Sequence, residues 1–180
     1  PRGGYVLTFW LLALGPVVGG AVAWLAVGST DNIVTPRATG QRFGGEVLRN
    51  RPAMLVIAGY TFHSWELLGM WAWTPAFMAA ALRAHGAASE RAAGLGAGLS
   101  ALFHVMGIVA GSSGGWLSDR WGRTAVIALM MAVSPACSFT FGWMLDAPLL
   151  LIALVGCVYG FSALGDSPVY STALTEAAAP

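Results

Sequence analysis

Two ionisable residues stand close together in an apolar and aromatic stretch that runs from Gly59 to Pro75. His63 and Glu66 are three residues apart, so they share one face if the stretch is helical. Counted from Ala53, His63 lies about 15 Å along such a helix, which is mid-depth in a hydrocarbon layer about 30 Å thick. An ionisable group there costs about 2.5 to 3.5 kcal/mol, so it faces a polar cavity or another ionisable group. Both side-chain types exchange protons, and this chemistry suits proton coupling.

The same face continues with apolar and aromatic residues. Met70 and Trp73 follow Glu66 at spacings of four and three, which places them beside the ionisable pair on a helix. These residues predict a substrate or proton site formed by His63, Glu66, Met70 and Trp73. In the structural alternative, His63 and Glu66 satisfy each other or a neighbouring helix and fix packing, while the tryptophans face lipid or the membrane interface.

Two further ionisable residues lie within apolar stretches later in the chain. His104 is a candidate for either a buried structural partner or a cavity residue. Asp166 precedes Pro168, which interrupts the hydrogen bonding of a helix. Asp166 therefore either binds solute or coupling ion, or caps the backbone that Pro168 leaves free.

A short charged island, Gly-Trp-Leu-Ser-Asp-Arg-Trp-Gly-Arg-Thr, separates two long apolar stretches. A tight turn between two helices needs glycine where backbones crowd, and a carboxylate there can pair with a helix N-terminus or an arginine. The alternative is an ordinary basic loop that fixes topology by its charge alone. The residues that define the pattern are Gly115, Asp119, Arg120, Gly122 and Arg123.

This island resembles the signature loop of the major facilitator superfamily of membrane transporters. The family pattern is glycine, three residues, acid, base, one residue, glycine, base, base, and Thr124 stands where the second base is usual. The resemblance implies a cytoplasmic loop whose arginines pair with Glu176 near the end of the last helix. The His-x-x-Glu stretch also resembles a variant of bacterial members, which implies a bacterial cytoplasmic (inner) membrane.

Composition independently indicates a membrane protein. Hydrophobic residues make up 57% of the chain and charged residues 9%, whereas a soluble domain carries about 25% charged residues. A formal charge of +1 indicates no nucleic-acid partner. Cys137 and Cys157 lie in apolar stretches, where a thiol behaves as a small hydrophobic group, so neither a disulfide framework nor a metal site is expected. We also expect no cofactor.

The expected fold is an all-α, polytopic transmembrane bundle of about five helices. Stretches of about 20 mostly apolar residues define the spans 5–27, 53–83, 95–114, 124–145 and 149–177. Residues 1–28 then hold one span, residues 29–52 a polar linker, and residues 53–180 a partial carboxy-terminal half of a transporter. The family has two six-helix halves, with the signature loop after the second helix of each half. The spans therefore correspond to helices six to ten, unless the island belongs to the amino-terminal half.

Glycine and proline predict local features of these helices. Gly107, Gly111 and Gly115 recur every four residues, which favours close approach of another helix. Gly69 and Pro75 predict a break in the second span.

Orientation follows from the arginines, because positively charged short loops stay in the cytoplasm. The linker 29–52 and the island at 116–123 are richer in arginine than the turns at 84–93 and 146–148. The first two are therefore predicted to be cytoplasmic and the other two to face outward.

Two classes of function fit these observations. The first is a secondary transporter that moves a small solute by alternating access, coupled to protons, and works as a monomer in the lipid bilayer. The second is an integral membrane enzyme that uses His63, Glu66 and Asp166 as acid, base or ligands. No metalloprotease or nucleophile motif is present in the sequence, so the transporter is favoured and an enzyme is not expected.

Overall fold

The computed structural model describes residues 3–28, 45 and 48–178, and this part of the chain contains helices and no strands. It divides into two units, residues 1–41 and 42–180. The first unit holds α1 (Gly3–Val27), an almost wholly apolar helix with Pro16 inside it. Most of the predicted linker, 29–52, lies outside the described residues.

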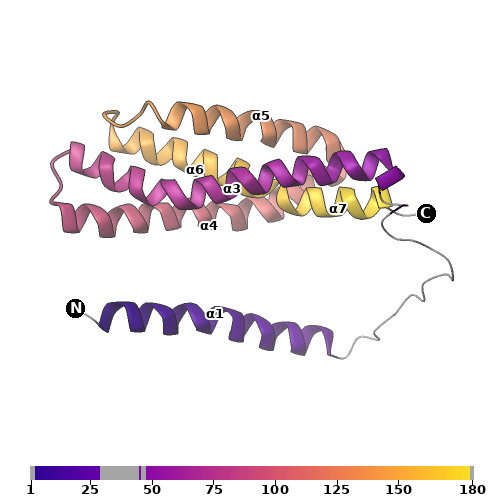
Figure 1. The fold of residues 1–180 in the computed structure, drawn as a ribbon, viewed down its shortest axis with the longest axis horizontal. Helices are drawn as coiled ribbons and strands as arrows, with labels where there is room; N and C mark the ends of the chain where they lie inside the picture. The colour runs from indigo at the N-terminus through magenta and orange to yellow at the C-terminus, as the bar shows by residue number, and fades with distance from the viewer. Residues whose placement is uncertain (1–2, 29–44, 46–47, 179–180) are drawn as a thin grey trace. The chain divides into compact units, whose positions relative to one another are not determined.

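The second unit is a bundle of long helices that run side by side (Figure 1). Two short connections, at residues 85–88 and 142–148, lie at one end, and the α4–α5 junction lies toward the other. The helices are α3 (Arg51–Ala84), α4 (Ser89–Trp121), α5 (Arg123–Phe141), α6 (Leu149–Gly165) and α7 (Ser167–Ala178).

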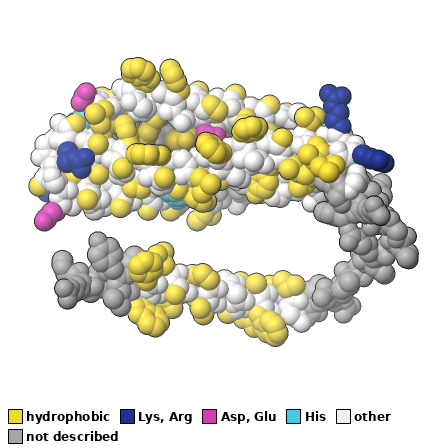
Figure 2. All heavy atoms as spheres, viewed as in Figure 1, with side chains coloured by type: hydrophobic (Ala, Val, Ile, Leu, Met, Phe, Trp, Pro, Cys, Tyr) yellow, Lys and Arg dark blue, Asp and Glu magenta, His cyan; other side chains and the backbone are white. Residues whose placement is uncertain are grey.

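The predicted class, an all-α transmembrane bundle, is confirmed. Four described segments are long and apolar enough to cross a membrane: Phe9–Val27, Ser89–Trp121, Arg123–Phe141 and Leu149–Ala177. On the face of the bundle shown in Figure 2, hydrophobic side chains cover much of its length and charged ones lie mainly at its ends. The protein is therefore an integral membrane protein.

The second predicted span, 53–83, is α3, which is long enough to cross a bilayer but is not among these four apolar segments. Its 34 residues include arginine at both ends and several polar groups between them. A helix of this length is about 51 Å long, so length does not limit it. The hydropathy of α3 is lower than that of the four apolar segments. This is expected for a helix that presents ionisable groups to the interior of a bundle.

The helix boundaries correct several predictions. The span predicted at 95–114 is longer, because α4 continues through the charged island to Trp121. The signature loop is therefore a single-residue break at Gly122, whose φ of +88° favours glycine. The segment 149–177 is interrupted at Asp166, between α6 and α7. Conversely, α3 is unbroken, since Pro75 lies inside a continuous helix.

The predicted glycine stripe on α4 is only partly a packing surface. A Cβ at Gly107 would lie 2.6 Å from the side chain of Leu164, whereas nothing lies within 4 Å of one at Gly111 or Gly115. The closest approach involves α6 instead, where a Cβ at Gly160 would lie 2.1 Å from the carbonyl oxygen of Phe103. Crowding therefore does not explain Gly111 or Gly115, and α4 packs on α6 through Gly107 and through glycines of α6 such as Gly160.

Helix α4 also packs closely against the break between α6 and α7. A Cβ at Gly114 would lie 2.8 Å from the carbonyl oxygen of Gly165. Asp166 follows directly, and its own carbonyl accepts the first hydrogen bond of α7, from the amide of Tyr170 at 2.8 Å. This close contact holds Asp166 inside the bundle.

Candidate functional site

His63 and Asp166 form a buried pair between α3 and the α6–α7 break. Their side chains are 1% and 2% exposed, and Nδ1 of His63 lies 3.1 Å from Oδ1 of Asp166. Neither atom has a hydrogen-bond partner among the described residues, so this contact is the main interaction of both. The carboxylate of Asp166 thus faces His63 across the helix interface.

The other nitrogen of the His63 ring is within hydrogen-bond distance of a hydroxyl. Nε2 lies 2.6 Å from Oγ of Ser167. A hydroxyl can donate to a neutral ring and accept from a protonated one. The Ser167 hydroxyl can therefore pair with Nε2 of His63 whether or not that nitrogen carries a hydrogen.

Two tyrosines surround the His63 ring. The ring centroids of Tyr60 and Tyr170 lie 5.6 and 5.7 Å from that of His63, and 5.6 Å from each other. A Cβ at Gly59 would lie 3.0 Å from the ring of Tyr170, so a side chain there would crowd the tyrosine. The aromatic rings shield the buried pair from its surroundings.

Glu66, one helical turn from His63 on α3, does not pair with it but faces α5. Oγ of Ser134 donates a 3.0 Å hydrogen bond to Oε2 of Glu66. The other oxygen, Oε1, is buried and has no hydrogen-bond partner among the described residues. His63 and Glu66 thus belong to two adjacent environments and do not satisfy each other, but each contacts a neighbouring helix, as the structural alternative also allows.

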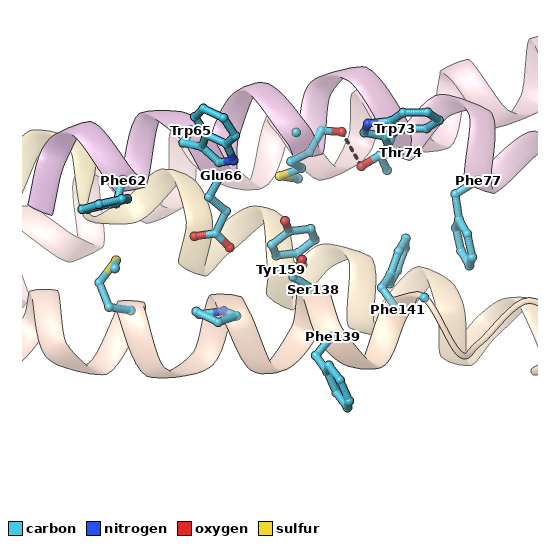
Figure 3. A pocket seen from close by; sticks show the side chains of 15 residues that line it. Phe62, Trp65, Glu66, Trp73, Thr74, Phe77, Ser138, Phe139, Phe141 and Tyr159 are labelled. Carbon is cyan, nitrogen blue, oxygen red and sulfur yellow. Dashed lines mark hydrogen bonds between the residues drawn. The ribbon is translucent and has the colours of Figure 1, made fainter.

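A groove of about 840 Å³ lies between α3 and α5, with Tyr159 of α6 at its floor. Figure 3 shows the carboxylate of Glu66 extending from α3 into this space, and Trp65 and Trp73 on the same helix. Met70 is buried against the groove, whereas Trp73 is 74% exposed at its rim. The predicted residues Glu66, Met70 and Trp73 therefore line one groove.

His104 lies apart from this groove. Nδ1 of its ring is 2.6 Å from the carbonyl oxygen of Ser100, and its ring centroid is 6.1 Å from that of Trp71. It lines a second cavity of about 640 Å³, which Ser167 also borders. His104 is both a structural partner and a cavity residue, because its Nδ1 contacts a backbone carbonyl of its own helix and its side chain lines the second cavity.

Arg123 connects three helices at the α4–α5 junction. Its guanidinium lies 3.1 Å from Oε1 of Glu176 on α7 and 2.5 Å from Oδ1 of Asp119 on α4. It also donates a 2.7 Å hydrogen bond to the hydroxyl of Ser118. The pairing expected for Glu176 is present, with Arg123 as its partner.

The second arginine of the island does not take part in this cluster. The guanidinium of Arg120 lies 4.0 Å above the ring of Trp116 on the preceding turn. Nearby, Nδ2 of Asn50 donates a 2.7 Å hydrogen bond to the carbonyl oxygen of Ala177. The start of α3, the α4–α5 junction and the end of α7 therefore meet at one end of the bundle.

Several site residues were missed in the sequence. Tyr60 and Tyr170 were detectable in principle, because each lies one helical turn from an ionisable residue that was identified. Ser134 and Tyr159 carry no such signal, since their proximity to Glu66 depends on how α5 and α6 pack. Within the described residues, no group of three His, Cys, Asp or Glu side chains is arranged to hold a metal ion.

The chain matches no model of a known protein family, no curated protein and no solved structure. The fold and the side-chain geometry by themselves define the class of the protein: it is an all-α integral membrane protein with ionisable residues inside its bundle.

Proposed function

We propose that this chain is part of a secondary transporter of the major facilitator type, which moves a small solute by alternating access and couples that movement to protons. The buried pair of His63 and Asp166 carries the proposal. Ionisable residues inside a membrane bundle are costly and mark ion or solute pathways. Transport sites also commonly lie where a spanning helix is interrupted, and Asp166 occupies such a break.

The cluster around Arg123 supports the alternating part of the proposal. Its contacts to Asp119 and Glu176 join α4, α5 and α7 at one end of the bundle. Ion pairs at the interface between moving parts commonly repack when a protein switches between two states, and we propose that this cluster holds its end of the bundle closed in one of them. Each contact is weak at a wet surface, which suits a lock that must open repeatedly.

The resemblance of the island at 115–124 to the family signature supplies the rest of the proposal. It includes a bacterial cytoplasmic membrane as the location and a monomer as the working unit. It also makes residues 53–180 part of the carboxy-terminal half, with α1 as the helix before the linker.

Transport is tested with the purified full-length protein in liposomes. The liposomes receive a mixture of small molecules extracted from cells, a pH gradient is imposed in each direction, and their contents are identified by mass spectrometry. We expect at least one solute to accumulate with the parent protein but not with His63→Ala or in protein-free liposomes. Equal contents in all three would refute transport, and a new product without accumulation would instead support a membrane enzyme.

A further inference from the structure

We infer that the groove between α3 and α5 binds an organic cation that carries aromatic or bulky apolar substituents. This inference names the solute class of the proposed transporter and takes its biological meaning from that function. Binding itself is measured without transport, so the two claims fail separately.

The first argument is the charge of the groove. Fifteen described residues line it, and Glu66 is the one acidic or basic side chain among them. A cation therefore meets an attractive charge in the groove, and an anion meets a repulsive one. The surrounding apolar walls strengthen this discrimination, because charges interact more strongly where water is excluded.

The second argument is that Glu66 lacks a full set of partners. Three buried side-chain atoms have no hydrogen-bond partner in the described residues: Nδ1 of His63, Oδ1 of Asp166 and Oε1 of Glu66. The first two lie 3.1 Å from each other, so Oε1 of Glu66 is the one of the three that has no polar neighbour of this kind. A buried carboxylate oxygen without a donor is costly, and a bound cation supplies the missing countercharge.

The third argument is the aromatic lining. Seven of the fifteen lining residues are Phe, Trp or Tyr. Figure 3 shows Phe62 on one side of Glu66, and Tyr159, Phe77 and Phe141 on the other, in the space between α3 and α5. The faces of aromatic rings attract organic cations, and aromatic cages are a common way to bind quaternary ammonium groups. An aromatic wall beside one carboxylate is thus complementary to a large cation with low charge density.

Lipid chains and a further apolar helix are the alternative occupants of this groove. Neither offers a countercharge, and Glu66 would then remain as an uncompensated polar group at an apolar surface. The hydrogen bond from Ser134 to Glu66 at 3.0 Å also holds the carboxylate at the groove. A cationic occupant would supply the countercharge to the carboxylate that Ser134 holds at the groove.

The test uses labelled tetraphenylphosphonium as the probe and tetraphenylborate, which has the same shape and the opposite charge, as its control. Binding of both to the full-length protein in detergent is measured by equilibrium dialysis, with empty micelles subtracted. We expect saturable binding of the cation and no comparable binding of the anion. Equal affinity for both ions, or no saturable binding of the cation, would overturn the inference.

Variants locate the binding. Glu66→Gln keeps the shape of the side chain and is expected to weaken cation binding by about tenfold or more, whereas Glu66→Asp keeps the charge and most of the affinity. Glu90→Gln, the same change at an exposed position outside the groove, should have no effect. Trp73→Leu should weaken binding by about two- to tenfold, and Trp121→Leu, outside the groove, should not.

The outcomes separate this inference from transport. Unchanged cation binding in a correctly folded, monodisperse Glu66→Gln protein would overturn the inference, even if the liposomes accumulate some other solute. Binding that depends on Glu66, in a protein that accumulates nothing in either gradient, would support the inference and refute the transport proposal.

Discussion

His63 and Asp166 depend on each other because Nδ1 of His63 and Oδ1 of Asp166 lie 3.1 Å apart inside the bundle and neither atom has a hydrogen-bond partner among the described residues. Removing one member of a buried pair leaves the other unpaired, which costs about 3 to 5 kcal/mol, whereas removing both polar groups costs much less. We therefore predict that His63→Leu is strongly destabilising and that adding Asp166→Asn restores part of the stability. The measurement is thermal unfolding of the purified full-length variants in detergent. A double variant no more stable than His63→Leu would show that the two residues do not interact.

At the residue scale, sequence reasoning identified the pairing of Glu176 with the island arginines but not the partners of the ionisable residues inside the bundle. Helical periodicity correctly placed His63 and Glu66 one turn apart, and the burial cost of charge correctly indicated that they need partners. The partner of His63 lies 103 positions away, at the break between α6 and α7, and that of Glu66 is on α5. These pairings depend on helix packing, which a single sequence does not specify.

At the scale of helices, small residues determine how α4 and α6 pack. A Cβ at Gly160 would meet backbone, the carbonyl oxygen of Phe103 at 2.1 Å, whereas a Cβ at Gly111 meets nothing within 4 Å. We predict that Gly160→Ala destabilises the protein by about 1 to 3 kcal/mol through overpacking. Gly111→Ala, a matched change in the interior of α4, should be neutral or stabilising by up to about 1 kcal/mol, since alanine favours helix.

The unfolding midpoints of these two variants, measured side by side, provide the check. If Gly160→Ala were as stable as Gly111→Ala, the close approach of α6 to α4 would be wrong.

The helices themselves were largely predictable, because long apolar stretches allow few alternatives in a membrane. The residues at which these helices begin and end were harder to predict. The charged island was predicted as a loop, yet the α4 helix continues to Trp121 since charged and polar residues are compatible with helix at its end. Proline was also misread at position 75, where the helix continues past it.

At the scale of the whole molecule, charge defines the two ends of the bundle. Arg49, Arg51, Arg120 and Arg123 outnumber Asp119 and Glu176 at the end where α3 begins and α7 ends, whereas two arginines and two acids balance at the other end. Positively charged segments remain in the cytoplasm. The arginine-rich end is therefore expected to be cytoplasmic.

Cysteine labelling of intact cells tests this orientation. After replacement of Cys137 and Cys157, single cysteines at the exposed positions Ala88 and Thr124 should react from opposite sides of the membrane. We predict that an impermeant reagent labels position 88 in intact cells and position 124 only after the cells are opened. Labelling of position 124 in intact cells would reverse the proposed orientation.

Proton-coupled transport is the central claim for the molecule as a whole, and we propose that Glu66, the carboxylate that lines the groove beside the buried pair, is the group that releases the proton. A glutamine at this position keeps the size of the side chain but cannot release a proton, so it should separate uphill transport from simple exchange. Glu90→Gln is the matched control, because it makes the same change outside the site.

The most direct measurement follows the solute that the parent protein accumulates in liposomes, with equal amounts of each variant. With an imposed pH gradient, the parent and Glu90→Gln should concentrate the solute, and Glu66→Gln should not. Without a gradient, and with the solute concentration raised to offset its weaker binding, Glu66→Gln should still exchange internal for external solute. If Glu66→Gln concentrates the solute as well as the parent does, Glu66 does not couple protons to transport and the account is contradicted.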